Sequence, residues 1–459
     1  MHDTRYSENL KQAIRSRRIV TPDGVQAGVV LIENEKIAAI RPHDEIVSAE
    51  SFVDLGDRFV LPGLIDVHVH INEPGRSEWE GFETGTQAAA AGGCTCVVDM
   101  PLNCIPSTTT VAALNEKRVA ANGKTYVDIA YWGGVVPGNT REIAPLAQSG
   151  VRGFKCFLTH PGTDEFEMVT ETDLQKAMPR VAETSLPLLA HAEMPGPIAN
   201  ASAHLDSKPA DWRRYRTYME SRPVEAELEA IRLLIRLSKE YRCRVHIVHL
   251  SAAAALDELE EARDEGLPIT VETCPHYLLF EAESIPDCAT QFKCAPPIRD
   301  AENREALWRG VRAGIIDLLA TDHSPCPPQL KCIEAGSFRA AWGGISSLSL
   351  ALSSVWTEAR KRGFQVTDIV RWMSEAPAKL AGLDRQKGRL LPGFDADLVV
   401  FDPDAEFEVS NENLYFRHAC TPYLGRRLKG KVTATLVRGR TCFEEGRFAK
   451  QAAGREVPS

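Results

Sequence analysis

The sequence predicts an α/β fold, a (β/α)8 TIM-like barrel joined to a small β-sandwich that both chain ends build. From residue 60 onward, eight short apolar runs alternate with helical patterns, whereas β-branched runs without helices occur at both ends of the chain. Strand-then-helix alternation favours parallel pairing, because parallel strands need a crossover connection. A chain of 459 residues accommodates one barrel of about 250 residues or more beside a smaller domain. A doubly wound open sheet is the alternative to a closed barrel.

The N-terminal segment is predicted to form a small antiparallel sheet. Apolar residues cluster at 25–32 and 37–40, and the polar stretch 33–36 between them is typical of a turn. We therefore assign residues 1–59 to the N-terminal part of the sandwich.

Residues 60–379 are predicted to form the barrel. The eight strand candidates, in order, are FVLPGLIDVHVH, CTCVVDMP, VDIAYWGGV, VRGFKCFL, LPLLAHAE, RVHIVHLS, PITVETCPHY and DLLATDHSP. After the fifth, Pro223 begins a segment with apolar residues at steps of three and four, which indicates an amphipathic helix with proline in its first turn. Before the eighth, Asp300 can cap a helix that Gly314 ends.

The C-terminal segment loses this helical pattern. Strand-like runs return near 395–402 and 431–439. Residues 380–459 are therefore predicted to complete the sandwich and to carry a C-terminal tail.

Composition excludes several classes of partner. The net charge is −10, and no basic stripe is present, so we expect no nucleic-acid partner, because phosphate binding needs a basic footprint. No apolar stretch approaches the length of about 18 residues that a membrane span needs, and the start of the chain lacks the apolar core of a signal peptide. We expect a cytoplasmic protein with no membrane partner.

Polar side chains recur at the ends of the predicted strands, where barrel enzymes place their working residues. They are His68, His70, Lys155, His191, His249, Asp322 and His323. Because residues i and i+2 of a strand face the same side, His68 and His70 can bind one cation together. Random placement would scatter such residues onto loops and outer helices, so the pattern predicts a metal centre at the barrel mouth.

Lys155 is the unusual member of this set. Its ammonium would be repelled by neighbouring divalent cations, so the side chain must be neutral or modified. Addition of carbon dioxide to the amine would give a carbamate, an anion with two oxygens that can bridge two metal ions. We therefore predict that Lys155 is carboxylated.

The order of these residues resembles the amidohydrolase superfamily, in particular its cyclic-amidase branch of allantoinases, dihydroorotases and hydantoinases. The resemblance extends over essentially the whole chain, from PGLIDVHVH through GFKCF, LAHAE, HIVHLS and ATDHSP to GRLLPGFDADLVVFD. Within the branch, HINEPGRSEWEGFETGTQAAAAGG, VDMPLN, CPHYL, APPIRD, TDHSPCPP and AWGGI are most similar to the allantoinases.

The resemblance implies a centre of two divalent metal ions. Its ligands would be His68 and His70 for one ion, His191 and His249 for the other, Lys155 as a bridging N6-carboxylysine, and Asp322. Asp322 would also be the catalytic proton shuttle. His249 matches the family position on the sixth strand, so His246, on the opposite side of that strand, is expected to pack behind the site.

The resemblance also implies a substrate class. Dihydroorotases carry an arginine two positions after the second histidine of the HxH pair, and this chain has Asn72 there. An amide can hydrogen-bond a ureido group but cannot clamp a carboxylate, which favours allantoin. The candidate substrate contacts are Asn72, Asn103, His276, Gly344 and Ile345.

The expected activity is hydrolysis of the cyclic amide of allantoin to allantoate by a hydroxide that bridges the two metals. The alternatives are a hydantoinase or dihydropyrimidinase, and a non-catalytic scaffold relative. Zinc is the first expectation for the metal, with cobalt, manganese or nickel also compatible with the ligands. Carbon dioxide is required for lysine carboxylation, and the resemblance implies a homotetramer.

Overall fold

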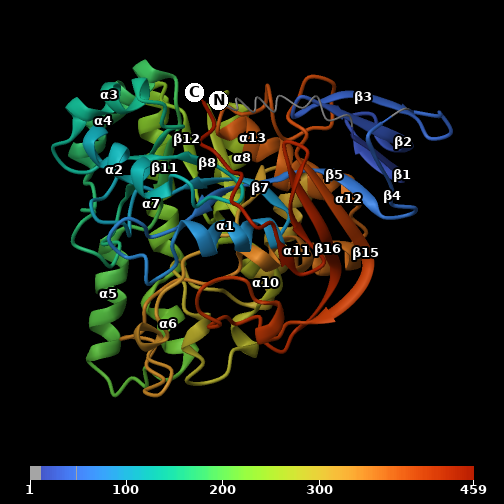
Figure 1. Ribbon diagram of the computed structural model, residues 1–459. Coiled ribbons are helices and arrows are strands. Elements are labelled where there is room, and N and C mark those ends of the chain that lie inside the picture. Colours follow the sequence, from blue (N-terminus) through green and yellow to red (C-terminus); the bar gives the residue numbers. More distant parts are fainter. Residues whose placement is uncertain (1–11, 48, 459) are drawn as a thin grey trace.

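The computed structural model describes residues 12–47 and 49–458. The chain forms a parallel barrel with a β-rich unit beside it, in which the first strands lie next to the last (Figure 1). Residues 1–11, which belong to the predicted sandwich segment and to the stretch searched for a signal peptide, lie outside the described residues.

The barrel uses eight strand positions in chain order, as predicted. They are β6 (Leu64–Val69), β7 (Cys94–Asp99), β8 (Asp128–Tyr131) continued by β9 (Gly133–Gly134), β10 (Phe154–Phe157), β11 (Leu188–His191), β12 (Val245–Ile247), β13 (Ile269–Thr273) and β14 (Leu318–Leu319). Between β8 and β9 the backbone N–H of Trp132 donates to Asp99 on one side, and that of Gly133 donates to Gly153 on the other. A parallel bridge between Val69 and His323 joins the eighth strand position to the first. The sheet closes, and the open-sheet alternative is wrong.

The helices connect these strands and cover the barrel. In chain order they are α1 (Phe82–Ala91), α2 (Val111–Ala121), α3 (Ile143–Gln148), α4 (Glu171–Thr184), α5 (Pro195–Asp206), α6 (Tyr215–Ser221), α7 (Val224–Tyr241), α8 (Leu256–Asp264), α9 (Pro275–Leu279), α10 (Ala301–Ala313), α11 (Ala351–Lys361), α12 (Val366–Val370) and α13 (Ala376–Leu380). Short 3-10 turns occur at η1 (Thr140–Glu142), η2 (Ala253–Ala255), η3 (Ala282–Ser284), η4 (Thr290–Phe292), η5 (Pro328–Lys331), η6 (Leu348–Leu350) and η8 (Asn411–Asn413), and η7 (Arg371–Glu375) is a π-helical turn. Within the described ranges, none of the helices has the length and hydropathy of a membrane span.

Two helix boundaries test the sequence-based predictions. The side chain of Asp300 accepts a hydrogen bond from the N–H of Asn303 at 2.8 Å, and Gly314 ends α10 with a φ of 77°, both as predicted. Pro223 was expected inside the first turn of α7. It is instead the extended residue that precedes the helix.

The β-rich unit is one mixed sheet built from both chain ends, as predicted. Its strands are β1 (Gln12–Thr21), β2 (Gly24–Glu33), β3 (Lys36–Pro42), β4 (Ser51–Asp54), β5 (Phe59–Pro62), β15 (Leu398–Glu408), β16 (Arg427–Val437), β17 (Arg440–Glu444) and β18 (Arg447–Phe448). The strand order is β18-β17-β16-β15-β5-β1-β2-β3, with β4 beside β1. Antiparallel pairing of β5 with β15 joins the two ends. The predicted hairpin of β2 and β3 is present.

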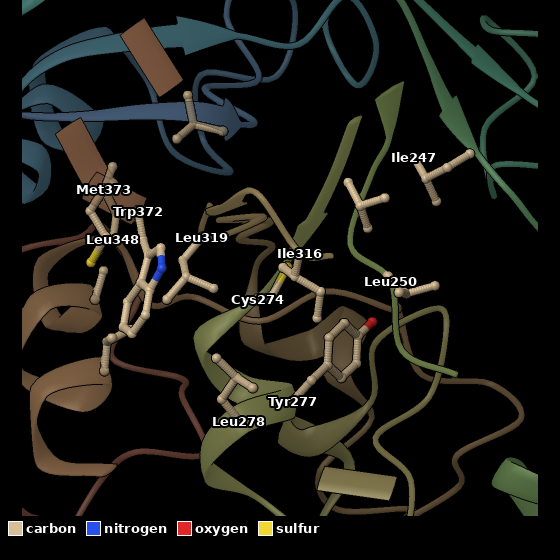
Figure 2. Close-up of a cluster of buried hydrophobic side chains, with 14 of the residues drawn as sticks. Ile247, Leu250, Cys274, Tyr277, Leu278, Ile316, Leu319, Leu348, Trp372 and Met373 are labelled. Carbon is tan, nitrogen blue, oxygen red and sulfur yellow. The ribbon is translucent and has the colours of Figure 1, made fainter. Parts of the chain in front are cut away.

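The core surrounds the barrel strands on both faces. All six residues of β6 and of β7 are buried, so neither strand shows the polar–apolar alternation of a strand with one face in water. Figure 2 shows part of this core, where Ile247 of β12, Leu319 of β14, and Trp372 and Met373 of η7 belong to one cluster. This packing fixes the strands whose ends carry the candidate site.

A buried charge cluster joins the barrel to the sheet of both chain ends. The ammonium of Lys387 lies 2.8 Å from Asp128 of β8, 2.9 Å from Asp395 and 2.7 Å from Asp397. The guanidinium of Arg438, which follows β16, also pairs with Asp128. The three carboxylates lie close enough together to resemble a cation site, but the protein's own cations already compensate them.

Candidate metal centre

A cavity of about 400 Å³ opens at the C-terminal ends of the barrel strands. Five of the six predicted metal ligands line it: His68, His70, His191, His249 and Asp322. They come from β6 and the residue that follows it, from β11, and from the segments after β12 and β14. The closed barrel therefore brings together side chains that lie more than 250 positions apart in the chain.

The carboxylate of Asp322 lies close to the imidazoles of His68, His70 and His249. Its Oδ1 is 3.3 Å from Nε2 of His68 and 3.3 Å from Nε2 of His70. His68, His249 and Asp322 each offer a ligand atom within 4.8 Å of the others. Burial alone would raise the pKa of Asp322, but His68, His70 and His249 outweigh it and hold that pKa well below its ordinary value. Asp322 is therefore an anionic oxygen donor in a ring of nitrogen donors.

The imidazole of His191 faces that of His249. Nδ1 of His191 is 3.0 Å from Nε2 of His249, and the two ring centroids are 4.6 Å apart. Burial lowers the pKa of both side chains, which favours neutral imidazoles with free lone pairs. Neutral imidazole and carboxylate are the donors that zinc and similar divalent ions prefer. The donor set fits a metal centre.

Lys155 of β10 is fully buried, and its Nζ has no hydrogen-bond partner among the described residues. The nitrogen lies 4.9 Å from the centroid of the Phe157 ring, which stacks on His191. Burial lowers the pKa of Lys155 to about 8. A buried amine without a partner is costly, so the position suits a chemically modified lysine.

Two carboxylates behind the imidazoles were missed by the sequence reasoning. Glu272 of β13 pairs with Nδ1 of His68 and lies 3.0 Å from Nε2 of His246. Glu193 lies 2.7 Å from Nε2 of His191 and is held by Arg222. Such partners fix the tautomer and orientation of metal-binding imidazoles. Glu193 could have been predicted from the sequence, because it follows His191 by two positions and residues i and i+2 of an extended segment face the same side.

His246 lies behind the centre, as expected. Its Nδ1 is 2.8 Å from the hydroxyl of Thr270, its Nε2 faces Glu272, and the ring is fully buried. It therefore acts on His68 only through Glu272.

The candidate substrate contacts divide into two groups. Asn103 and Gly344 line the cavity. Asn72 and Ile345 do not: the amide of Asn72 donates to the carbonyl of Pro325 at 3.3 Å, and Ile345 forms a backbone bridge with His323 while its side chain packs in the core. The Oδ1 of Asn72 has no hydrogen-bond partner among the described residues, and the role of both residues as substrate contacts stays a prediction.

His276 is the third residue that does not line the cavity. It is fully buried on α9 against the ring of Tyr277, at a centroid distance of 4.2 Å, and burial lowers its pKa to about 4. Both nitrogens of its ring have no hydrogen-bond partner among the described residues, so its role as a substrate contact stays a prediction.

Comparison with known proteins agrees with this geometry. Residues 59–442 match the Amidohydrolase family. The chain is 44% identical over 443 residues to an allantoinase from Streptomyces avermitilis, covering 96% of this chain and 97% of that protein. It is 44% identical over 458 residues to an allantoinase from Arabidopsis thaliana, covering 96% and 90%.

A solved structure shares the whole architecture. The L-hydantoinase (dihydropyrimidinase) from Arthrobacter aurescens superposes with a TM-score of 0.92 at 31% identity, covering 98% of this chain and 100% of that one. Sequence match, fold and the donor set at the barrel mouth lead to the same conclusion, that the chain belongs to the amidohydrolase family.

Proposed function

We propose that this chain is a metal-dependent hydrolase that opens the hydantoin ring of allantoin to give allantoate. The observation that carries the proposal is the convergence of four imidazoles and Asp322 on one cavity, with the unpartnered Lys155 amine buried at the end of β10. The allantoinases to which the chain is 44% identical support the choice of substrate.

We assign the metal ligands as follows. His68 and His70 would hold one ion and His191 and His249 the other, with Asp322 and a carbamate on Lys155 as the remaining ligands. When bound, a pair of divalent ions lowers the pKa of water and polarises a carbonyl. Zinc is our first choice, and cobalt, manganese and nickel suit the same donors.

Asp322 is the proton carrier in this proposal. Its carboxylate is anionic and accepts a hydrogen bond from the Ser324 hydroxyl at 2.9 Å. It takes a proton from the attacking water and returns it to the ring nitrogen that leaves, as a general base and then a general acid. Glu272 and Glu193 hold the imidazoles of His68 and His191 in orientation while this happens.

In this proposal, loops above the mouth of the barrel bind the hydantoin ring of the substrate. Asn103 and Gly344 line the cavity and offer amide and backbone groups to the ring. Asn72 supports the loop through Pro325, and neither it nor Lys155 supplies the charged fork that a dihydroorotate carboxylate would need.

A hydantoinase activity is the second candidate, because the L-hydantoinase of Arthrobacter aurescens shares the fold at a TM-score of 0.92. The scaffold alternative has no support in the site, since every proposed ligand position carries a donor. A homotetrameric assembly and a cytoplasmic location complete the proposal.

The test uses purified protein with its metal content measured. We expect two metal equivalents per chain and turnover of allantoin, with little turnover of hydantoin or dihydroorotate. Turnover of hydantoin without allantoin would replace the proposal with the second candidate. A metal-free, inert protein would overturn both.

A further inference from the structure

One wall of the cavity gathers three cationic side chains, of which Arg222 alone has a role in the proposed hydrolysis, through Glu193. Arg222 and Lys293 line the cavity. Lys331 is buried directly behind, and its ammonium donates to the backbone oxygen of Lys293 at 3.2 Å. Three basic side chains therefore lie at or directly behind this wall.

Only one of these cations is neutralised. Arg222 forms a forked pair with Glu193, with Nε at 2.9 Å from Oε1 and Nη2 at 2.5 Å from Oε2. Lys331 donates to backbone oxygens, those of Trp342 at 3.0 Å and of Gly344 among them. Over residues 12–47 and 49–458, neither lysine has a carboxylate within ion-pair distance. Burial and the neighbouring cations Lys331 and Arg222 lower the pKa of Lys293 to about 7.

The donors of Lys293 can be counted. Its Nζ donates to the carbonyl of Ala341 at 2.5 Å and to that of Arg339 at 3.3 Å, and it lies 5.2 Å from the centroid of the Tyr218 ring. An ammonium has three N–H donors. One donor is left, on a side chain whose neighbours Tyr218 and Ala341 also line the cavity.

The third N–H of Lys293 restricts which chemical group of a ligand can bind there. A half-buried cation among carbonyl dipoles and other cations gains most from a further oxygen acceptor. A carboxylate is best held by a fork of two donors, and the fork of Arg222 is already occupied by Glu193. A single N–H suits a single carbonyl oxygen.

We propose that Lys293 is a specificity-determining residue whose ammonium binds the ureido carbonyl that distinguishes allantoin from unsubstituted hydantoin. This inference rests on the proposed function and deepens it, because it names the part of the substrate that this wall recognises. The ring is held at the metal centre, and its side group reaches the wall of Arg222 and Lys293.

The experiment compares metal-loaded wild-type enzyme with Lys293→Met, which keeps the aliphatic stem and removes the donor. We expect kcat/KM for allantoin to fall roughly ten- to a hundredfold, mainly through KM, as for loss of a hydrogen bond from a charged group. The inhibition constant of hydantoin, used as a competitive inhibitor, should stay unchanged. Lys293→Gln, which retains an N–H donor without the charge, should lose less than the methionine variant.

Lys208→Met, an exposed lysine after α5, is the matched control and should behave as wild type. Equal weakening of allantoin and hydantoin would mean that Lys293 has only a structural role, and would overturn the inference. Hydantoin-5-acetate, which carries a carboxylate, can be tested as a competitive inhibitor of both enzymes. If Lys293→Met weakens binding of this inhibitor more than it weakens binding of allantoin, the lysine recognises a carboxylate and the inference is overturned. Failure of the wild-type enzyme to turn over allantoin would instead sink the proposed function, and the inference with it.

Discussion

At the scale of single residues, the mouth of the barrel is held in an uncommon backbone conformation. Asn72, Asn103, His249 and Asp322 have φ angles of 66°, 63°, 39° and 46°. Non-glycine residues seldom adopt positive φ, and where they do they cluster at functional sites. Asparagine, aspartate and histidine adopt this region more often than other non-glycine residues, so these residue types suit the conformation.

Replacement of Lys155 by alanine tests the proposed carbamate. We expect Lys155→Ala to bind less than the full metal complement and to lose nearly all activity, because the proposed carbamate cannot form on alanine. Metal content by elemental analysis and turnover of allantoin provide the measurement. Addition of a small carboxylate such as acetate or propionate should restore part of both.

The exposed Lys124, at 44% side-chain exposure, is the control, and Lys124→Ala should retain metal and activity. Full metal occupancy in Lys155→Ala would rule out the bridging role.

Glu272→Gln tests the carboxylate behind the metal centre. Burial alone would raise the pKa of Glu272, but His68 and His246 outweigh it and lower that pKa, so the group is an anion in the folded protein. Loss of the charge should weaken metal affinity by about 10- to 100-fold, as measured by competition with a chelator. Thr270→Val, which removes only the hydroxyl contact to His246, should change affinity far less. Unaltered affinity in Glu272→Gln would show that His68 needs no such partner.

At the scale of elements, the strand ends position the site and the helix caps fix where each connection begins. The cap at Asp300 starts α10, which packs Leu307, Trp308 and Val311 into the core just before β14. The helix therefore sets the approach of the strand that precedes Asp322.

Asp300→Ala should lower the unfolding free energy by about 1 kcal/mol, the usual cost of losing an N-cap side chain. Thermal and denaturant unfolding followed by circular dichroism would measure it. Arg309→Ala, at an exposed position of the same helix, is the control and should have little effect. Metal content should be unchanged in both, and a loss of metal in Asp300→Ala would mean that the cap reaches the site.

At the scale of the whole molecule, the buried cluster around Lys387 is the electrostatic link between the barrel and the sheet of both chain ends. Burial alone would lower the pKa of Lys387, but Asp397 and Asp128 outweigh it and raise that pKa well above its ordinary value of 10.5. The lysine is thus charged in the folded protein at neutral pH.

Lys387→Met should destabilise the protein by about 3–5 kcal/mol, because it removes the cation that three buried carboxylates share and leaves Asp397 without an ion-pair partner among the described residues. Since the folded pKa is raised, the stabilisation is fully present below about pH 10.5, the unfolded value, and is lost as pH rises toward the folded value. Unfolding measured from pH 7 to 11 should therefore show a constant difference from wild type that shrinks only at the alkaline end.

Lys36, the other lysine that pairs with Asp395, has a side chain that is 43% exposed. Lys36→Met should therefore lower the unfolding free energy far less than Lys387→Met. Equal effects of the two substitutions would contradict a special role for the buried lysine.

Much of this fold was predictable because its signals are local or periodic. Eight apolar runs separated by helical patterns indicated the barrel strands, and Asp300 and Gly314 marked the ends of α10. Closure of the barrel was not local, since it depends on a bridge between Val69 and His323, which no short window of sequence contains.

The sequence by itself determined which residue types stand at the strand ends, since parallel strands place their C-terminal ends at one mouth. Only the tertiary structure decided what supports and surrounds them. Glu272 comes from β13, whereas Arg222 and Lys293 come from connections between other elements. Asn103 and Gly344 line the cavity, and the amide nitrogen of Asn72 instead donates to the backbone of Pro325. The physical reason is that strand period and helix period fix the direction of a side chain within its own element, whereas the partners it meets depend on long-range packing between elements.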